Sequence, residues 1–229
     1  MHYPSIRIKL LSTLICAFLF CFQLNAEEGW VSLFDGESMD GWVQMNGTVT
    51  YAVEEGSIVG TSLRGDSPMS FLCTEKQYSD FELEFEVKLF DKELNSGVQI
   101  RSLPKETKRK GAKYGPIAGP QIEITANKNG GPTPSGYVYG QGWDGWITSK
   151  EARVPHRHFR LGEWNRYRVV AKGPKIVSYL NGVLITETMV PSDRHTTQPK
   201  GHIGLQVHSL KEAPRPFRVA WKNIRIKEL

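Results

Sequence analysis

The segment DFELEFEVKLF, residues 80–90, is the feature that most constrains the fold of this chain. Apolar residues alternate with charged ones along it: Phe81, Leu83, Phe85, Val87 and Leu89 against Glu82, Glu84, Glu86 and Lys88. Successive side chains of a β-strand point to opposite faces, so this period of two predicts a long strand with one buried and one wetted face. A single strand cannot bury its own apolar face, and the rest of the chain must supply a second layer.

Similar strand signals recur along the chain, separated by glycine and proline. Residues 166–188 predict two successive hairpins, with turns at Gly173-Pro174 and at Asn181-Gly182, a strong hairpin signal. Further strands are expected at 50–60, 97–102, 119–125, 202–209 and 218–229. No segment keeps apolar residues at helical spacing for three turns. The pattern predicts an all-β protein in which two antiparallel sheets form a sandwich or jelly roll.

The first 26 residues have the layout of a secretory signal peptide. A basic start precedes the apolar run Leu10–Phe22, which is too short to span a membrane comfortably, and a polar stretch ends at Ala26. Cleavage after Ala26 would leave residues 27–229 as one domain with no membrane attachment. Cys73 would then be its only cysteine, so no intrachain disulfide could form. We expect a bacterial protein that is periplasmic or secreted.

The chain has a formal net charge of +5, and its basic residues are scattered apart from KETKRKGAK, residues 105–113. We interpret this run as an exposed loop, the alternative being a phosphate-binding patch. No nucleic-acid-binding motif is present, so no nucleic acid partner is expected. No metal or other cofactor is expected either: this kind of fold can hold a divalent ion, but no acidic cluster predicts one. The oligomeric state is not predicted.

Three predicted strands carry unusual polar residues on the face that alternates with their apolar face. These residues are Asn95, Gly97, Gln99 and Arg101 in NSGVQIRS, Gln121 and Glu123 in GPQIEIT, and Gln206 and His208 in GLQVHS. Residues i and i+2 of a strand lie about 6.5–7 Å apart on one face. The solvated face of the strand at 80–90 carries Glu and Lys, whereas these faces carry amide, guanidinium, carboxylate and imidazole groups. The pattern favours a functional face over an ordinary solvated one.

The segment GQGWDGW places Trp143 and Trp146 among three glycines. An indole buries a large area, so these side chains either plug the end of the sandwich or stand at its surface as a platform for a sugar ring. The segment follows the strand of Glu123 by one loop. This position favours stacking against a sugar, with Tyr139 beside the indoles.

Taken in order, the motifs resemble the 3-keto-disaccharide hydrolase family. They are WVSLFDGESMDGW, FLCTEKQYSDFELEFEVK, NSGVQIRS, GPQIEI, EWNRYRVVAKGPKIVSYLNG, GHIGLQVHS and VAWKNIRIKEL. Each motif is weak alone, but their ordered combination is specific and spans nearly all of the chain after residue 26. The resemblance implies a concanavalin-A-like jelly-roll sandwich and export from a bacterium. It also implies action on glycosides oxidised at C3 of the sugar, by hydrolysis or by lyase and hydratase steps through a 2-hydroxy-glucal.

Such a reaction requires a base for the C2 proton, an acid for the leaving oxygen and a donor for the developing enolate. In this sequence the resemblance implies Glu123 and His208 as the acid/base pair, with Arg101 either stabilising the enolate or binding a hydroxyl. The other polar residues of the face would bind sugar hydroxyls: Asn95, Gln121 and Gln206. Many relatives have Asp in place of Glu123. The acidic residue that follows their strand is absent here, or is replaced functionally by Asp144.

Two other functions stay open. A non-catalytic carbohydrate-binding domain would keep the aromatic platform but would need no acid/base pair. A conventional glycoside hydrolase needs two carboxylates flanking the bond, whereas the QIEI strand supplies one. An oligosaccharide or glycoside is the expected partner in all three cases.

Overall fold

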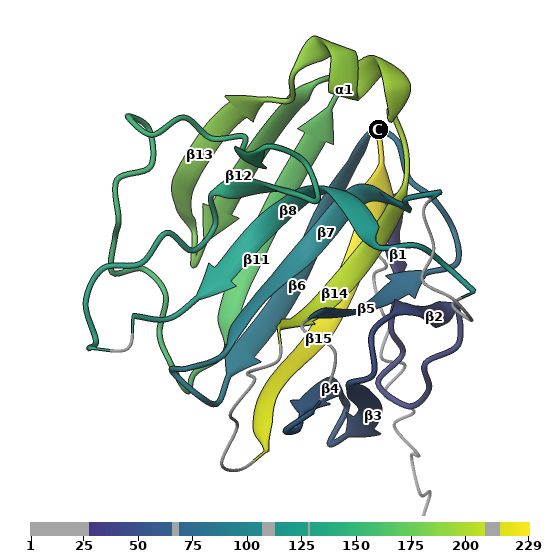
Figure 1. The fold of residues 1–229 in the computed structure, drawn as a ribbon, viewed down its shortest axis with the longest axis vertical. Helices are drawn as coiled ribbons and strands as arrows, with labels where there is room; N and C mark the ends of the chain where they lie inside the picture. The colour runs from purple at the N-terminus through teal and green to yellow at the C-terminus, as the bar shows by residue number, and fades with distance from the viewer. Residues whose placement is uncertain (1–27, 66–68, 107–112, 128, 209–215) are drawn as a thin grey trace, which may run out of the picture.

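The structure is a computed structural model, and it describes residues 28–65, 69–106, 113–127, 129–208 and 216–229. The predicted signal peptide, residues 1–26, lies outside the described residues. Within them, two antiparallel sheets lie face to face (Figure 1). The predicted all-β sandwich of two antiparallel sheets is confirmed.

Sheet A has eight strands within the described residues, in the order β13–β12–β11–β6–β15–β4–β3, and β1 also pairs with β15. Their bounds are Trp30–Ser32 (β1), Thr50–Glu54 (β3), Ser57–Ser62 (β4), Phe81–Leu89 (β6), Asn165–Lys172 (β11), Lys175–Leu180 (β12), Val183–Met189 (β13) and Phe217–Glu228 (β15).

Sheet B has seven strands among the residues that the structure describes, in the order β10–β9–β8–β7–β14–β5–β2. Their bounds are Trp42–Asn46 (β2), Met69–Thr74 (β5), Asn95–Pro104 (β7), Ile117–Thr125 (β8), Val138–Gln141 (β9), Gly145–Trp146 (β10) and His202–His208 (β14).

Strand β6 lies in the middle of sheet A and follows the predicted alternation. Its apolar side chains are all buried in the main core: Phe81, Leu83, Phe85, Val87 and Leu89. Phe85 stacks on Tyr167 of β11 with ring centroids 5.0 Å apart. Burying one such side chain contributes roughly 1.5–3 kcal/mol, so the apolar face of this one strand is a major part of the stability of the core.

Both predicted hairpins are present in sheet A. Gly173 turns β11 into β12 with a φ of +52°, and Asn181 and Gly182 turn β12 into β13 with φ of +51° and +83°. Two successive residues with positive φ are the signature of the type I′ turn, whose twist matches that of the flanking strands.

The strands that the sequence did not predict are short: β1, β2, β5, β9 and β10 have two to six residues. So few residues show no clear alternation. The only helix within the described residues is α1 (Ser192–Thr197), which has no buried residue. No helix in that part of the chain is long and apolar enough to cross a membrane.

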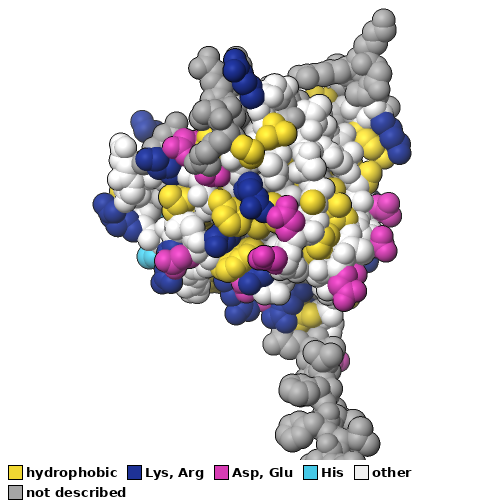
Figure 2. Space-filling model, turned by 90° about the horizontal axis from the view of Figure 1, so that it is seen from below, with side chains coloured by type: hydrophobic (Ala, Val, Ile, Leu, Met, Phe, Trp, Pro, Cys, Tyr) yellow, Lys and Arg dark blue, Asp and Glu magenta, His cyan; other side chains and the backbone are white. Residues whose placement is uncertain are grey.

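Charged side chains of both signs are intermixed on the surface. In Figure 2, Lys and Arg side chains lie beside Asp and Glu over the visible face. Most of the predicted basic loop at 105–113 falls outside the described residues. Lys105, at its start, donates a hydrogen bond from Nζ to the carbonyl of Gly142, at 2.6 Å.

The predicted position of Arg101 on the polar face of sheet B is wrong. The register between β7 and β8 shifts between Gln99 and Leu103, and Arg101 has a φ of +48°. Such a bulge inserts a residue and breaks the alternation of side chains. The sequence alone shows no glycine or proline at this point that would have revealed it.

Arg101 instead binds the loops at the end of the sandwich. Its side chain is buried and donates to the carbonyls of Ser79 (Nε, 2.5 Å) and Gly173 (Nη1, 2.6 Å) and to the carboxylate of Asp80 (Nη2, 2.9 Å). Gly173 lies in the turn between β11 and β12 of sheet A, so this guanidinium joins β7 of one sheet to a turn of the other.

We predict that Arg101→Met lowers the free energy of unfolding by about 3 kcal/mol, because it leaves buried acceptors without a donor. The control is Lys175→Met, which removes an exposed ion pair with Glu187 and should cost less than about 1 kcal/mol. Urea denaturation of both variants measures the difference. Equal losses in the two variants would contradict the assigned role of Arg101.

Candidate functional site

The register of sheet B places the other predicted polar residues on one face. Glu123 of β8 lies opposite Gly97 of β7, and Gly97 lies opposite Gln206 of β14. One step along the strands, Asn95 pairs with His208. The residues between them face the core and are buried: Val98, Ile122, Ile124, Leu205 and Val207. Five of the predicted site residues therefore share the outer face of sheet B: Asn95, Gln121, Glu123, Gln206 and His208.

A chain of hydrogen bonds runs along this face to Glu123. Ser102 Oγ donates to Gln99 Oε1 (2.6 Å), and Gln99 Nε2 donates to Gln121 Oε1 (2.6 Å). Gln121 Nε2 then donates to Glu123 Oε2 at 3.1 Å. Asn95 Nδ2 donates to the other oxygen, Oε1, at 2.5 Å. Every link donates towards Glu123, and both oxygens of its carboxyl group therefore accept an N–H. We call Ser102, Gln99, Gln121, Asn95 and Glu123 the amide relay.

The environment of Glu123 shifts the pKa of its carboxyl group upward. The side chain is buried, and desolvation raises the pKa of its carboxyl group, although the hydrogen bonds from Asn95 and Gln121 oppose that rise. Within the described residues no cation forms an ion pair with it. A buried carboxyl group with a raised pKa is suited to giving or taking a proton near neutral pH.

Gly97 provides the space that the relay occupies. A Cβ at this position would lie 2.5 Å from Cδ of Gln121. The Gln121 side chain thus lies directly over the backbone of β7, where a side chain of any size would displace it. The sequence shows this glycine inside a strand, but only the register shows what lies above it.

Gln206 is buried beside the amide relay but makes no hydrogen bond to it within the described residues. It is 1% exposed, and within the described part of the chain its Oε1 has no hydrogen-bond partner. A buried acceptor left unpaired costs about 1–3 kcal/mol, and a ligand hydroxyl or amide would remove that cost. His208, at the end of β14, is partly buried and adjoins residues outside the described ranges.

Tyr139 and Trp146 extend the same face towards the sheet edge. Tyr139 pairs with Gln121 on one side and with Trp146 on the other. The rings of Tyr139 and Trp146 meet edge to face, with centroids 5.3 Å apart, and the guanidinium of Arg153 lies 4.4 Å over the Trp146 ring. All these side chains are partly buried, so the edge of the site is aromatic and only partly open.

Trp143 and Asp144 lie in the turn of the β9–β10 hairpin and have other contacts. Trp143 packs against the main core, with Arg194 of α1 5.6 Å over its ring. Asp144 is exposed and pairs with the same arginine at 3.1 Å. The two indoles of GQGWDGW therefore differ: Trp143 helps to close the end of the sandwich, and Trp146 lies on the polar face.

Cys73 also lies in sheet B, in a small apolar cluster with Met45, Phe71 and Ile117. Burial raises the pKa of its thiol to about 12. It is therefore a buried, unreactive thiol.

Comparisons with known structures agree with the sandwich. A protein of Parabacteroides distasonis, provisionally described as a glycosyl hydrolase, is 20% identical, with 88% of this chain and 94% of that chain covered and a TM-score of 0.56. The carbohydrate-binding module CBM66 of Bacillus subtilis is 18% identical, with 82% and 96% covered and a TM-score of 0.52.

A Bacillus subtilis protein of unknown function with a galectin-like fold is 11% identical, with 82% and 89% covered and a TM-score of 0.58. At these identities the likeness establishes the fold alone. No curated protein matches the chain.

The match to a protein family is more specific than the likeness of fold. The profile of the 3-keto-alpha-glucoside-1,2-lyase-like domain matches residues 29–227, which is most of the chain. The family match supports a carbohydrate-active role. As the ordered motifs predicted, the chain belongs to the family of 3-keto-alpha-glucoside-1,2-lyase-like domains.

Proposed function

We propose that this protein is an exported enzyme that cleaves or hydrates glycosides whose sugar carries a ketone at C3. The observation that supports this most is the buried Glu123, whose pKa is raised and whose carboxyl group is held by amides. Glu123 is also the only acidic residue in the strands of sheet B. A conventional hydrolase would need a second carboxylate across the glycosidic bond. A 3-keto sugar requires only one.

The proposed reaction begins at C2, whose hydrogen is acidified by the neighbouring ketone. The Glu123 carboxylate takes that proton, and the C–H electron pair forms an enolate across C2 and C3. The enolate then expels the oxygen at C1 as the C1–O bond breaks, and the His208 imidazolium protonates this leaving oxygen. The products are a 2-hydroxy-3-keto-glucal and a free alcohol. Addition of water across the new C1–C2 double bond would complete a hydrolysis.

The contacts support these roles for the residues. Both oxygens of Glu123 accept N–H groups, an arrangement that suits a carboxylate acting as base. Asn95 donates to Glu123 and lies opposite His208 in the register, so it stands between the strands of the proposed base and the proposed acid.

Gln206 takes the place that the sequence assigned to Arg101. An enolate oxygen needs a preorganised donor, and Arg101 is engaged at the end of the sandwich. Only Gly97 lies between Gln206 and Glu123 in the register, and within the described residues the buried Oε1 of Gln206 has no partner. In the proposed complex Oε1 accepts a hydrogen bond from a sugar hydroxyl, and the Nε2–H group of the same amide donates to the oxygen at C3.

A second candidate function is carbohydrate binding without chemistry. The partly buried Trp146, beside Tyr139, is the observation that favours it, because an aromatic side chain at the edge of a polar face suits a sugar ring. Binding of a 3-keto-glucoside without release of its aglycone would support this alternative.

Export is proposed from residues 1–26 alone. A protein recovered from the periplasm or the medium with its N-terminus at Glu27 would support it, and an intact N-terminus on protein retained in the cytoplasm would contradict it.

We predict that the protein releases aglycone from a 3-keto-glucoside and not from the unoxidised parent. Glu123→Gln should lower kcat by about 10²–10⁴, the usual worth of a general base. The control is Glu86→Gln, a carboxylate on the outer face of sheet A, which should keep full activity. Release from both sugars would indicate a conventional hydrolase, and a fully active Glu123→Gln would remove Glu123 from the mechanism.

The pH dependence of kcat/KM should show the raised pKa of Glu123. Activity should be lost on the acid side as the base is protonated, with an apparent pKa above its ordinary value of 4.5. Gln121→Met removes an N–H that stabilises the carboxylate, so it should move this acid limb to higher pH. Gln141→Met, whose amide contacts Met69 and not Glu123, is the control. An acid limb that stays in place in Gln121→Met would refute the relay.

The two indoles of the hairpin should give different kinetic results. Trp146→Ala should raise KM roughly 3- to 10-fold with a smaller loss of kcat, because it removes a binding surface for the sugar. Trp143→Ala should mainly lower the Tm, because it removes core contacts. Steady-state kinetics and thermal unfolding of both variants measure these effects, and the reverse pattern would exchange the two roles.

A further inference from the structure

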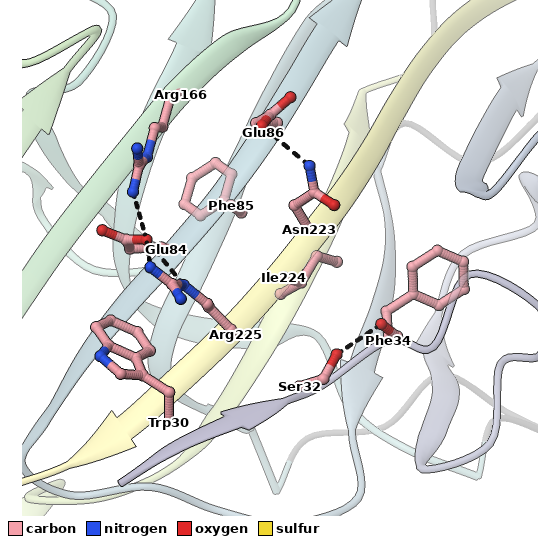
Figure 3. Close-up of a pocket in the computed structure, with 10 residues that line it drawn as sticks. All are labelled: Trp30, Ser32, Phe34, Glu84, Phe85, Glu86, Arg166, Asn223, Ile224 and Arg225. Atoms are coloured by element: carbon pink, nitrogen blue, oxygen red, sulfur yellow. Dashed lines mark hydrogen bonds and ion pairs between the residues drawn. The ribbon is translucent and has the colours of Figure 1, made fainter. Parts of the chain in front are cut away.

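The outer face of sheet A, on the other side of the sandwich from Glu123, has a cleft of ≈ 510 Å³. Figure 3 shows the side chains that line it, among them Trp30 and Ser32 of β1, Glu84 of β6, Arg166 of β11, and Asn223 and Arg225 of β15. The register of β15 shifts between Lys222 and Arg225, and the inserted residue brings Asn223 onto this face.

Glu84 lies at the centre of the cleft with one oxygen engaged. Arg166 Nη2 (2.8 Å), Arg225 Nε (2.9 Å) and Arg225 Nη2 (2.7 Å) all donate to Oε2. Figure 3 shows the dashed lines meeting at this one oxygen. Within the described part of the chain no hydrogen bond reaches Oε1, although the side chain is only 11% exposed. An acceptor is thus held rigidly in the cleft without a donor.

The charges of the cleft are already balanced. Its lining contains two carboxylates, Glu84 and Glu86, and two guanidiniums, Arg166 and Arg225. Both guanidiniums bind Glu84, so their charge is already offset by that carboxylate and gives a phosphate or a uronate little advantage. The cleft therefore suits a polar ligand without charge.

The central carboxyl group of this cleft, that of Glu84, does not have the raised pKa that makes Glu123 a proposed catalyst. Burial raises the pKa of Glu84, but the hydrogen bonds and charges of Arg166 and Arg225 outweigh it, and the pKa is lowered. Glu84 stays ionised and cannot protonate a leaving group at neutral pH. Glu86 accepts from Asn223 Nδ2 at 3.0 Å. The arrangement can bind a ligand, but it has no general acid.

Aromatic side chains stand at both ends of the polar floor. Trp30 is partly buried, with the guanidinium of Arg225 4.5 Å over its ring. A second cleft of ≈ 490 Å³ shares Glu84 and Arg166 and extends to Tyr179 of β12. From β1 to β12 the sheet advances four strands, which is about 19 Å at 4.7–4.9 Å per strand. The groove is thus long enough for several sugar rings.

We propose that the outer face of sheet A binds a neutral oligosaccharide, as a second site without catalytic activity. Trp30 stacks on one sugar ring, Glu84 Oε1 accepts a hydrogen bond from a hydroxyl, and Asn223 and Arg166 contact neighbouring hydroxyls. The site would hold the protein on a glycan chain while the opposite face acts. It does not depend on the reaction proposed for Glu123.

The test uses the full-length protein carrying Glu123→Gln, so that no turnover disturbs binding. The probes are unmodified α-1,4- and β-1,4-linked glucohexaoses, with an oligogalacturonate of equal length as the charged comparison. Calorimetry gives the Kd at millimolar probe, and ¹⁵N spectra report the six indole N–H groups. Trp30→Ala should weaken binding about 5- to 10-fold, the worth of one stacked aromatic ring.

Matched variants locate the site. Trp164→Ala removes another indole of this face that lies under a cation, Lys222 at 4.2 Å, but outside both clefts, and it should bind normally. Trp146→Ala removes the aromatic of the opposite face, so the hexaose should still shift the Trp30 indole N–H signal in this variant. Asn223→Gly preserves the positive φ of the bulge and should weaken binding even if Trp30→Ala is unstable.

Four outcomes would overturn the proposal. They are no binding of either neutral hexaose, tighter binding of the oligogalacturonate, loss of binding in Trp146→Ala with normal binding in Trp30→Ala, and equal loss in Trp164→Ala. The kinetic assay with a 3-keto-glucoside is separate. A protein that binds hexaose but releases no aglycone would disprove the proposed reaction and leave this site intact.

Discussion

A carboxyl group buried without a cationic partner is costly, and the polar face of sheet B is organised around one such group. Glu123 receives N–H groups on both oxygens, and its carboxylate, which can only accept, gives the relay behind it a single direction. Each amide must turn its oxygen towards the previous donor and its nitrogen towards Glu123. The relay depends in turn on the register of β7 and β8 and on the missing side chain of Gly97.

The buried glutamates of the two sheets have different partners, and their pKa values shift in opposite directions. Glu84 on sheet A is held by two guanidiniums, which lower its pKa and keep it ionised. Glu123 on sheet B is held by amides, which carry no charge and cannot offset its desolvation. The first arrangement suits a fixed acceptor in a binding groove, and the second suits a group that exchanges a proton. The choice of partner, and not burial itself, separates the two roles.

This contrast also separates the candidate functions. Two carboxylates line the cleft of sheet A, as in a conventional hydrolase, but two arginines keep one of them, Glu84, ionised. Sheet B has a carboxyl group with a raised pKa but no second one in its strands. Elimination from a 3-keto sugar needs only that one, and the family of the chain is consistent with such chemistry.

Alternation and turn residues in the sequence determined the fold class, the central strand β6 and the shared face of Asn95, Gln121, Glu123, Gln206 and His208. These features are local, because a period of two and an Asn-Gly turn need no knowledge of distant residues. Tertiary structure alone decided the rest. A bulge turned Arg101 away from that face, the core took up Trp143 but left Trp146 at the site, and the register set Gln121 over Gly97. Each of these depends on which strand lies beside which, and on a residue distant in the chain. No local pattern encodes that information.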